Sequence, residues 1–162
     1  TVRPSEQPDL ARVDALLARA YPRLLNPDYA PSMLVLALPK ISRAQPALVT
    51  SGSYFLVEDD GALLGAGGWT AAAPGGGAVT RGVGHIRHVV TDDRATRRGV
   101  GRMLMEHIFE DASAQGLRRL ECLSTLTAVP FYAAMGFDVV RDITVPLGPG
   151  IDFPAVEMTR DL

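Results

Sequence analysis

Hydrophobic residues recur along this chain with two different spacings, which predict a mixture of helices and strands. Residues 9–20 and 100–112 each carry an apolar stripe at helical spacing, and residues 29–38 form a third helical segment. A short helix is expected after Thr127, with Pro130 in its first turn. The strand-like segments are residues 2–4, 53–58, 62–69, 85–91, 117–124, 137–145 and 155–160.

Turn-forming residues separate these segments. Residues 59–61, Asp-Asp-Gly, predict a hairpin between two strands, and residues 74–77, Pro-Gly-Gly-Gly, predict a flexible loop. We expect the first helix to end at Pro22, and Gly116 and Gly136 to end the two later helices. After the loop at residues 74–77, strands and helices alternate, so the sequence predicts an α/β fold around a central mixed sheet.

Composition limits the class of protein. A chain of 162 residues with 47% hydrophobic and 21% charged residues predicts one water-soluble domain, residues 1–162. The net charge of -2 argues against nucleic-acid binding. The single cysteine, Cys122, excludes an internal disulfide and is expected in the core rather than as a nucleophile, and the three histidines lack metal-ligand spacing. Without a membrane-length apolar run or a signal-peptide pattern, we expect a cytoplasmic protein that binds no metal and no membrane.

Residues 97–102, Arg-Arg-Gly-Val-Gly-Arg, join a predicted strand to a predicted helix. Two glycines let backbone N–H groups approach a ligand, and the first N–H groups of a helix attract negative charge. With three arginines nearby, the segment predicts a phosphate or pyrophosphate site. A nucleotide-triphosphate loop would need a lysine and a hydroxyl residue after Gly101, and a dinucleotide fingerprint would need a small residue in place of Leu104. A tight turn with solvated arginines is the alternative without a ligand.

A second motif, Pro-Phe-Tyr-Ala-Ala-Met-Gly-Phe, occupies residues 130–137. Together the two motifs resemble the GCN5-related N-acetyltransferase (GNAT) superfamily: the first resembles its acetyl-CoA pyrophosphate loop and the second its Phe-Tyr-x-x-x-Gly-Phe signature. Residues 54–69 also resemble the hairpin that precedes these motifs in the family. The resemblance implies a mixed, mostly antiparallel sheet of six to seven strands flanked by about four helices.

The resemblance implies acetyl-CoA as cosubstrate and assigns residues to it. Backbone groups of residues 89–91 would hold the pantetheine and thioester, provided that this strand splays from its neighbour, and residues 97–102 would hold the pyrophosphate. Two positions depart from the family pattern, because Thr96 replaces the usual Gln or Arg and Thr125 replaces a frequent asparagine. The expected cofactor-binding residues are Val89, Val90, Thr91, Thr96, Arg97, Arg98, Gly99, Val100, Gly101, Arg102, Thr125 and Tyr132.

Acetyl transfer from a thioester to an amine needs a proton donor for the thiolate and a base for the amine. Tyr132 is the candidate general acid, since a phenol with a pKa of about 10 is neutral at pH 7 and still donates; packing of its helix is the alternative. By the family resemblance, His85 lies where many relatives carry a catalytic glutamate, and imidazole suits a general base. Strand alternation places His88 on the opposite face, lining the cofactor side or in packing. Glu58 and Glu121 are the alternative bases.

The resembled family builds its acceptor site from the first two helices and the hairpin. The matching aromatic residues are Trp69, Tyr29 and Tyr21, with core or rim packing as the alternative. Two functions stay open: an N-acetyltransferase that acts on a small-molecule or peptide amine by direct attack, and a non-catalytic acyl-CoA sensor on the same fold. A third alternative is a phosphate-ligand binder of another fold. Relatives are often homodimers, and nothing in the sequence decides the oligomeric state.

Overall fold

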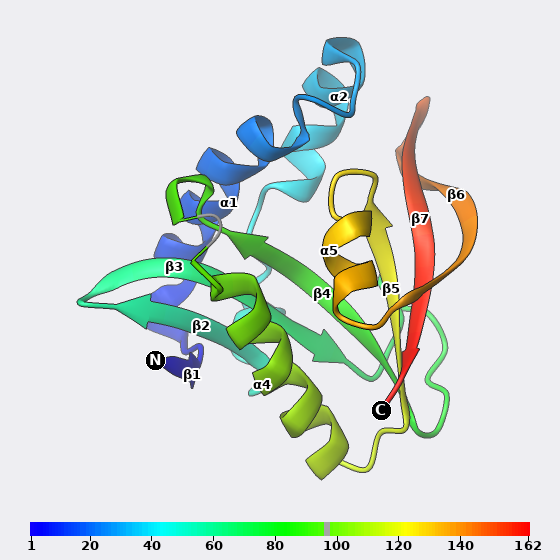
Figure 1. Cartoon of the computed structure of the whole chain (residues 1–162). Coiled ribbons are helices and arrows are strands. Elements are labelled where there is room, and N and C mark those ends of the chain that lie inside the picture. The colour runs from blue at the N-terminus through cyan, green and yellow to red at the C-terminus, as the bar shows by residue number, and fades with distance from the viewer. Residues whose placement is uncertain (96–97) are drawn as a thin grey trace.

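The computed structural model of the chain describes residues 1–95 and 98–162, in which a seven-stranded mixed sheet carries helices on both faces (Figure 1). The strand order is β1-β2-β3-β4-β5-β7-β6; β4 and β5 pair in parallel, and the other neighbours pair antiparallel. The strands are β1 (Val2–Pro4), β2 (Tyr54–Asp59), β3 (Ala62–Thr70), β4 (Val83–Thr91), β5 (Arg119–Thr125), β6 (Asp138–Gly148) and β7 (Ile151–Asp161). The helices are α1 (Leu10–Leu25), α2 (Pro31–Ile41), α3 (Pro46–Val49), α4 (Val100–Ala114) and α5 (Val129–Ala134), with 3₁₀ turns at Gln7–Asp9 and Asp93–Ala95.

Two hydrophobic clusters hold helices against opposite faces of the sheet. On one face α1 buries Val13, Leu16 and Leu17 together with residues of α3 and the strands. On the other face α4 buries its predicted apolar stripe, including Leu104 and Ile108, and α5 joins the same cluster. Burying one such aliphatic side chain contributes about 1.5–3 kcal/mol. The predicted α/β fold with a mixed, mostly antiparallel sheet is therefore confirmed.

The parallel pair β4 and β5 separates after its first residues. Residues 83–85 pair with residues 119–121, and no further pair joins the two strands in the described part of the chain. Figure 1 shows the strands meeting at their lower ends and diverging upward, with α5 at the opening. The splay that the cofactor site requires is thus present, and it opens the sheet between β4 and β5.

A bulge in β4 lies within this diverging segment. Residues 66–68 of β3 face residues 87–90 of β4, so β4 contains one extra residue. His88 occupies the bulge with φ +46°, a left-handed conformation that non-glycine residues rarely adopt. The Tyr54 hydroxyl donates to the His88 carbonyl oxygen at 2.8 Å, and Gln45 Nε2 lies 3.2 Å from His88 Nε2. The bulge breaks the strict alternation of side chains along β4.

Two predicted helix boundaries are wrong. α1 continues past Pro22 to Leu25, because the burial of Leu25 offsets the hydrogen bond that proline removes. Thr127 does not cap α5; the Ala128 N–H donates instead to Thr125 Oγ1 at 3.2 Å. The short helix α3 was not predicted, since four residues carry too little periodicity.

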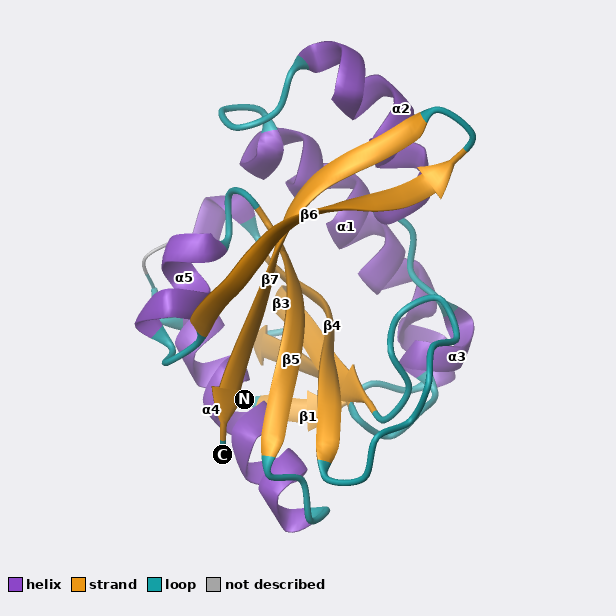
Figure 2. Ribbon diagram, turned by 90° about the vertical axis from the view of Figure 1, so that its right-hand side faces the viewer, coloured by secondary structure: helices purple, strands orange, loops and turns teal. Residues whose placement is uncertain are grey.

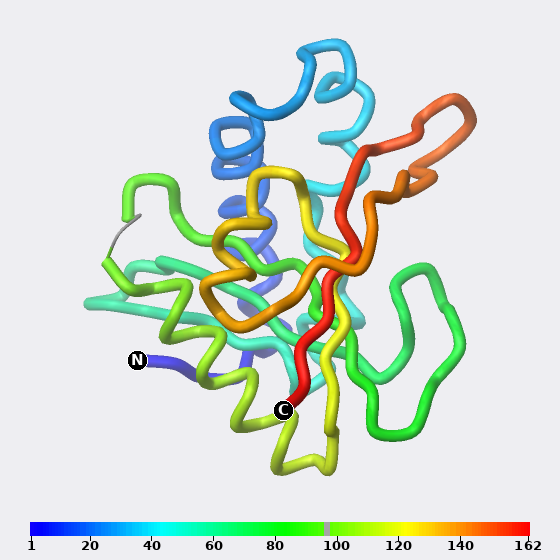
Figure 3. Tube along the Cα trace, turned by 45° about the vertical axis from the view of Figure 1, so that its right-hand side comes forward, coloured from blue at the N-terminus to red at the C-terminus, as the bar shows by residue number. Residues whose placement is uncertain are grey.

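The last two strands form a hairpin that rises beyond the rest of the sheet (Figure 2). Both strands are longer than predicted, because the chain turns tightly at residues 149–150, Pro-Gly. The outer part of the hairpin packs against α2 through Val145, Leu147 and Phe153. Figure 3 shows this hairpin and the β3–β4 loop as the two segments that extend furthest from the sheet on that side of the molecule.

Candidate active site

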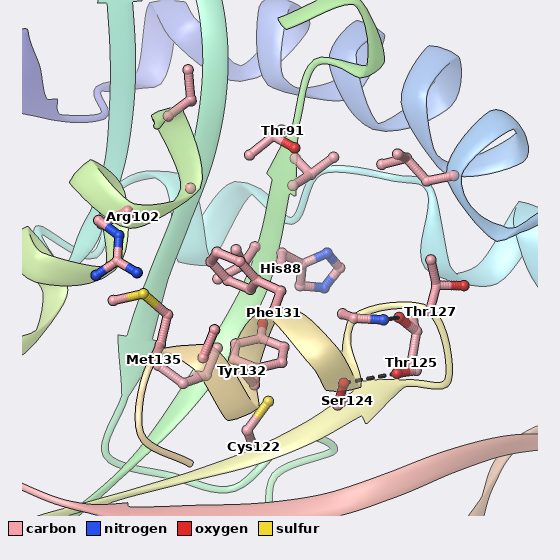
Figure 4. A pocket seen from close by; sticks show the side chains of 18 of the residues that line it. His88, Thr91, Arg102, Cys122, Ser124, Thr125, Thr127, Phe131, Tyr132 and Met135 are labelled. Atoms are coloured by element: carbon pink, nitrogen blue, oxygen red, sulfur yellow. Dashed lines mark hydrogen bonds between the residues drawn. The ribbon is translucent and has the colours of Figure 1, made fainter. Parts of the chain in front are cut away.

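A cleft of about 480 Å³ fills the opening between β4 and β5 (Figure 4). Five elements line it: the end of α1, the outer part of β4, the first turn of α4, the outer part of β5, and α5. The lining residues are Tyr21, Leu24, Leu25, Ile86, His88, Val89, Val90, Thr91, Ala95, Gly99, Val100, Gly101, Arg102, Cys122, Leu123, Ser124, Thr125, Thr127, Ala128, Phe131, Tyr132, Ala134 and Met135.

The first turn of α4 forms one end of the cleft. Gly99 precedes the helix at φ +73°, a conformation suited to glycine, and the space that its side chain would occupy is open. The Met103 N–H donates to the Gly99 carbonyl oxygen at 3.0 Å, so the N–H groups of residues 100–102 precede the helical hydrogen bonds. Together with the helix dipole, these amides favour an anion at this end of the cleft.

Arginines add positive charge around this turn. Arg98 and Arg102 are each more than half exposed and pair with exposed carboxylates at 3.3 and 4.0 Å. Exposed ion pairs of this kind contribute little, so both guanidinium groups can turn toward a bound anion. Thr96 and Arg97, which were also predicted for this site, lie outside the described residues.

The outer part of β4 supplies backbone groups along the cleft. Beyond His85, the edge of β4 that faces β5 has no strand partner in the described chain. Residues 89–91 lie on this stretch and line the cleft. Their backbone polar groups on that side are open to a ligand, as the predicted contact with pantetheine requires. Thr125 lines the cleft from the opposite strand.

A buried carboxylate, paired with two arginines, fixes the chain where it leaves β4. Asp92 is 4% exposed and accepts from Arg19 Nη2 of α1 at 2.5 Å and from Arg94 Nη2 at 3.2 Å. Burial alone would raise the pKa of Asp92, but the bonds from Arg94 and the charges of both arginines leave it below its usual value. This carboxylate therefore ties α1 to the segment that leads toward Gly99.

Tyr132 lies in the wall of the cleft, on α5 (Figure 4). Its ring packs edge-on against Phe131 and Phe137, with both centroid distances at 5.3 Å. Burial, followed by the nearby Cys122 thiol and neighbouring phenols, raises the pKa of Tyr132 well above its usual value. The hydroxyl is consequently protonated at neutral pH and is able to donate a hydrogen bond.

Cys122 lies beside Tyr132 on β5 (Figure 4). Burial raises the pKa of its thiol to about 12, and the neighbouring Tyr132 hydroxyl offsets only part of that rise. Because the thiolate is the nucleophilic form, this protonated thiol is inert at neutral pH. The cysteine is 3% exposed, in agreement with the core position expected from the sequence.

The sequence matches a known family over most of its length. The family model described as "Acetyltransferase (GNAT) family" matches residues 12–137. The chain belongs to the acetyltransferase (GNAT) family. The resemblance inferred from the glycine loop and the Phe-Tyr-x-x-x-Gly-Phe motif is thus confirmed. No curated protein matches the sequence at a significant level.

Solved structures of acetyltransferases share this fold. A GCN5-related N-acetyltransferase from Rhodopseudomonas palustris has a TM-score of 0.81 at 20% identity, covering 100% of this chain and 95% of that chain. The PaiA N-acetyltransferase from Thermoplasma acidophilum, in complex with coenzyme A, has a TM-score of 0.75 at 12% identity, covering 100% and 98%. An N-acetylglutamate synthase from Neisseria gonorrhoeae, complexed with coenzyme A and N-acetyl-glutamate, has a TM-score of 0.65 at 20% identity; the match covers 100% of this chain but only 35% of that chain.

In this acetyltransferase His85 does not line the main cleft. Its ring lines a second cavity of about 190 Å³ that lies where β4 and β5 diverge, and its Nδ1 is 3.8 Å from Glu121 Oε2. Burial lowers the pKa of His85, the Glu121 charge partly offsets this, and the Arg87 charge adds to it. Ile86 and Cys122 are among the residues that line both cavities, so they form the boundary between them.

His88 reaches the main cleft instead, because it sits at the bulge. Burial, together with the Arg87 charge, lowers the pKa of His88 to about 4, so its ring is neutral at pH 7. No sequence pattern indicates the bulge, since the residues on both sides of His88 are typical of one continuous strand. The other two proposed bases lie elsewhere: Glu58 pairs with Arg3 and Arg12 at the far side of the sheet, and Glu121 lines the small cavity.

Two of the three aromatic residues predicted for the acceptor site are held by hydrogen bonds to distant parts of the chain. Trp69 Nε1 donates to Asp111 Oδ2 of α4 at 2.8 Å, and the indole packs in the core beneath α4. The Tyr29 hydroxyl donates to the Pro154 carbonyl oxygen at 2.7 Å and accepts from the Leu126 N–H at 2.9 Å. Neither side chain lines a described cavity, because each is held by contacts distant in sequence.

Tyr21, the third predicted aromatic residue, does line the main cleft, from the end of α1. Leu24 and Leu25, which line the cleft beside it, belong to the part of α1 that continues past Pro22. Among the described residues, no group of histidine, cysteine, aspartate and glutamate side chains is arranged to hold a metal ion. In the same part of the chain, no helix is long and apolar enough to cross a membrane.

Proposed function

We propose that this protein transfers the acetyl group of acetyl-CoA to a primary amine of a small molecule or peptide by direct attack. One observation carries the proposal: a continuous cleft joins the open amides at the start of α4 to the Tyr132 phenol. Two of the similar structures contain coenzyme A, and they share this fold over all of the present chain. An elongated molecule with an anionic diphosphate and a sulfur at the far end fits such a cleft.

In the proposed complex, the diphosphate lies at residues 99–102, where the glycine conformation and the first-turn amides of α4 favour it. The pantetheine follows the open edge of β4 along residues 89–91, with Thr125 on the facing strand. Such an edge can also offer an N–H group to the thioester oxygen and so stabilise negative charge that develops there. The thioester sulfur then lies near the Tyr132 hydroxyl.

The reaction forms one bond and breaks another. The neutral amine attacks the thioester carbonyl carbon, a C–N bond forms, and the C–S bond breaks with its electron pair on sulfur. The amine nitrogen loses one proton and the sulfur gains one, so the products are the N-acetylated amine and free coenzyme A. Tyr132 donates a hydrogen bond to the departing sulfur. The pKa of Tyr132 lies well above 10. Full transfer of its proton to a thiolate with a pKa of about 8.5 therefore costs at least about 2 kcal/mol. The phenolate left by such a transfer is reprotonated through solvent by the proton that the nitrogen loses.

His85 is the proposed base, acting from the small cavity. Its lowered pKa leaves the imidazole neutral at pH 7, so it is available to accept a proton. The boundary formed by Ile86 and Cys122 separates the ring from the main cleft, so a water molecule is needed to relay the proton. Glu121, 3.8 Å from the His85 ring, stabilises the imidazolium that results.

Release of free thiol from acetyl-CoA, measured with a panel of amines, tests this function. We expect thiol release that depends on an amine, together with an N-acetylated product in the mass spectrum. The alternative is a non-catalytic acyl-CoA sensor on the same fold. Binding of acetyl-CoA by calorimetry without turnover of any amine would favour the sensor.

A further inference from the structure

A half-buried arginine lies on β4, one residue before the bulge, and it lacks a carboxylate partner. Arg87 Nη1 donates to Thr70 Oγ1 at 3.2 Å and Nη2 donates to Gln45 Oε1 at 3.1 Å. Within the described part of the chain, no aspartate or glutamate pairs with this guanidinium. Burial lowers the pKa of Arg87, and no acidic neighbour counters that effect. A guanidinium that is partly removed from water and has no carboxylate partner favours the binding of an anion.

Other arginines around the same strands do have carboxylates. Arg19 and Arg94 pair with Asp92, and Arg98 pairs with Asp59. The acidic residues of the small cavity are also paired, Glu121 with Arg119 at 3.1 Å and Glu157 with Arg141 at 2.8 Å. Arg87 therefore differs from its neighbours in having neutral partners only.

The neighbouring polar groups make this cluster cationic. Gln45 Oε1 accepts from Arg87, so its amide nitrogen faces His88 Nε2 at 3.2 Å, and that nitrogen must be the acceptor. The His88 proton is consequently on Nδ1, which has no hydrogen-bond partner among the described residues. The cluster of Arg87, Gln45 and His88 thus carries one positive charge and only donors toward a further ligand.

Arg87 itself lines neither cavity, but Gln45 joins it to His88, which lines the main cleft. Arg87 and His85 share one face of β4, because residues 85–87 pair regularly with residues 68–70 of β3. That face is opposite the one that α4 covers, where Ile86 packs. In an extended strand, Cα atoms two positions apart are separated by about 6.5–7 Å. One small amino acid, with its carboxylate at Arg87 and its amine linked to His85 through the relaying water, matches such a spacing.

We propose that the acceptor carries a carboxylate close to its amine, and that Arg87 binds this carboxylate while the amine is directed toward His85 and the thioester. The acceptor class is then amino acids and similar amino-carboxylates rather than simple amines. This inference rests on the proposed acetyl transfer. The planar guanidinium has donors left beyond those given to Thr70 and Gln45, and its fork geometry matches a carboxylate.

Matched acceptors test the inference. Thiol release is measured with amino acids and with their carboxamides, for example glycine and glycinamide. The amine of the carboxamide is less basic, so at neutral pH its intrinsic reactivity is the greater, and a preference for the acid must come from binding. We expect the wild type to prefer the acids, and Arg87→Gln to lower the acid-to-amide ratio of kcat/KM about 10- to 100-fold, chiefly through KM of the acid.

Two further variants test whether the effect depends on the charge of Arg87, on its guanidinium fork, or on the loss of any arginine. Arg87→Lys keeps the charge but loses the fork, so its ratio falls between wild type and Arg87→Gln. Arg81→Gln changes an exposed arginine of the β3–β4 loop and keeps the wild-type ratio. Equal use of acids and amides by the wild type, or an unchanged ratio in Arg87→Gln at unchanged thermal stability, would overturn the carboxylate site and leave acetyl transfer standing.

Ligand binding tests the carboxylate site even if the protein turns over none of the amines. Thermal unfolding is measured with coenzyme A and either member of an acid–amide pair. Stabilisation by the acid alone, lost in Arg87→Gln, supports the carboxylate site even where no thiol is released and the proposed transfer fails. Equal shifts with acid and amide, or no shift with either, contradict it.

Discussion

The two ends of this site are built in different ways. The proposed cofactor end is contiguous in sequence: residues 99–102 supply a glycine turn and the amides of a helix start, and the cleft runs from there to Tyr132. The acceptor face is assembled from parts of the chain that lie far apart, with Gln45 from the α2–α3 loop, Thr70 from β3 and Arg87 from β4. Short motifs therefore reveal the first end, whereas only the fold brings the second together.

The difference also affects what holds each end in place. The cofactor end depends on a glycine conformation and on the Asp92 cluster, which are local to the β4–α4 junction. The acceptor face depends on the bulge at His88, which Tyr54 and Gln45 stabilise from other elements. Substitutions at the first end should change the chemistry and cofactor binding directly, and those at the second should change substrate choice and acid stability.

The largest effect is expected at Tyr132. Tyr132→Phe removes the donor to the departing sulfur and should lower kcat roughly 10²- to 10³-fold, with little change in affinity for coenzyme A. Steady-state kinetics and calorimetry measure the two quantities. Tyr21→Phe removes another phenol from the same cleft and should have a much smaller effect. Equal rates in Tyr132→Phe and wild type would remove Tyr132 from the role of proton donor.

The second largest effect is expected from a negative charge introduced at the start of α4. Gly99→Asp places a carboxylate beside the expected diphosphate and should raise the Kd of coenzyme A roughly 100-fold, because juxtaposed like charges cost several kcal/mol. Gly99→Asn is the matched control, since it has nearly the same size and asparagine tolerates φ +73° better than most residues. Calorimetry that finds the same Kd in both variants would contradict a diphosphate at this turn.

Substitution of His85, the proposed base, should have a smaller effect than the two substitutions above. It should also change the pH dependence of the rate. Because the pKa of His85 is lowered by burial, the acid limb of kcat/KM should lie below pH 6.5, with activity full above it and lost as the imidazole is protonated. His85→Gln should lower kcat/KM about tenfold and remove this limb. A pH profile that keeps the same acid limb in the variant would assign the base elsewhere.

His88 should affect stability rather than rate. Its pKa is about 4 in the fold and about 6.5 in an unfolded chain, so the neutral ring stabilises the fold fully above pH 6.5. As the pH falls from 6.5 to 4, the unfolded state binds the proton first, and about 3 kcal/mol of stability is lost. Between pH 7 and pH 4, urea unfolding should show a loss of stability about 3 kcal/mol larger in wild type than in His88→Gln. Equal losses in both proteins would indicate that the ring titrates normally.

Sequence reasoning reached the fold because the α4 stripe and the alternating strands are regular over many residues. It proposed the cofactor end because Gly99, Gly101 and Tyr132 lie in short motifs with a local physical reason. It did not reach the proposed acceptor face for two reasons. The bulge at His88 depends on a hydroxyl from Tyr54, which no periodicity reveals, and Trp69 bonds to Asp111, which lies 42 residues away in sequence.

A crystal structure with coenzyme A tests the central claim most directly. The account predicts diphosphate oxygens within hydrogen-bond distance of the N–H groups of residues 100–102, pantetheine along the open edge of β4, and the sulfur facing the Tyr132 hydroxyl. A diphosphate bound away from the start of α4, or a sulfur on the far side of the sheet from Tyr132, would contradict it.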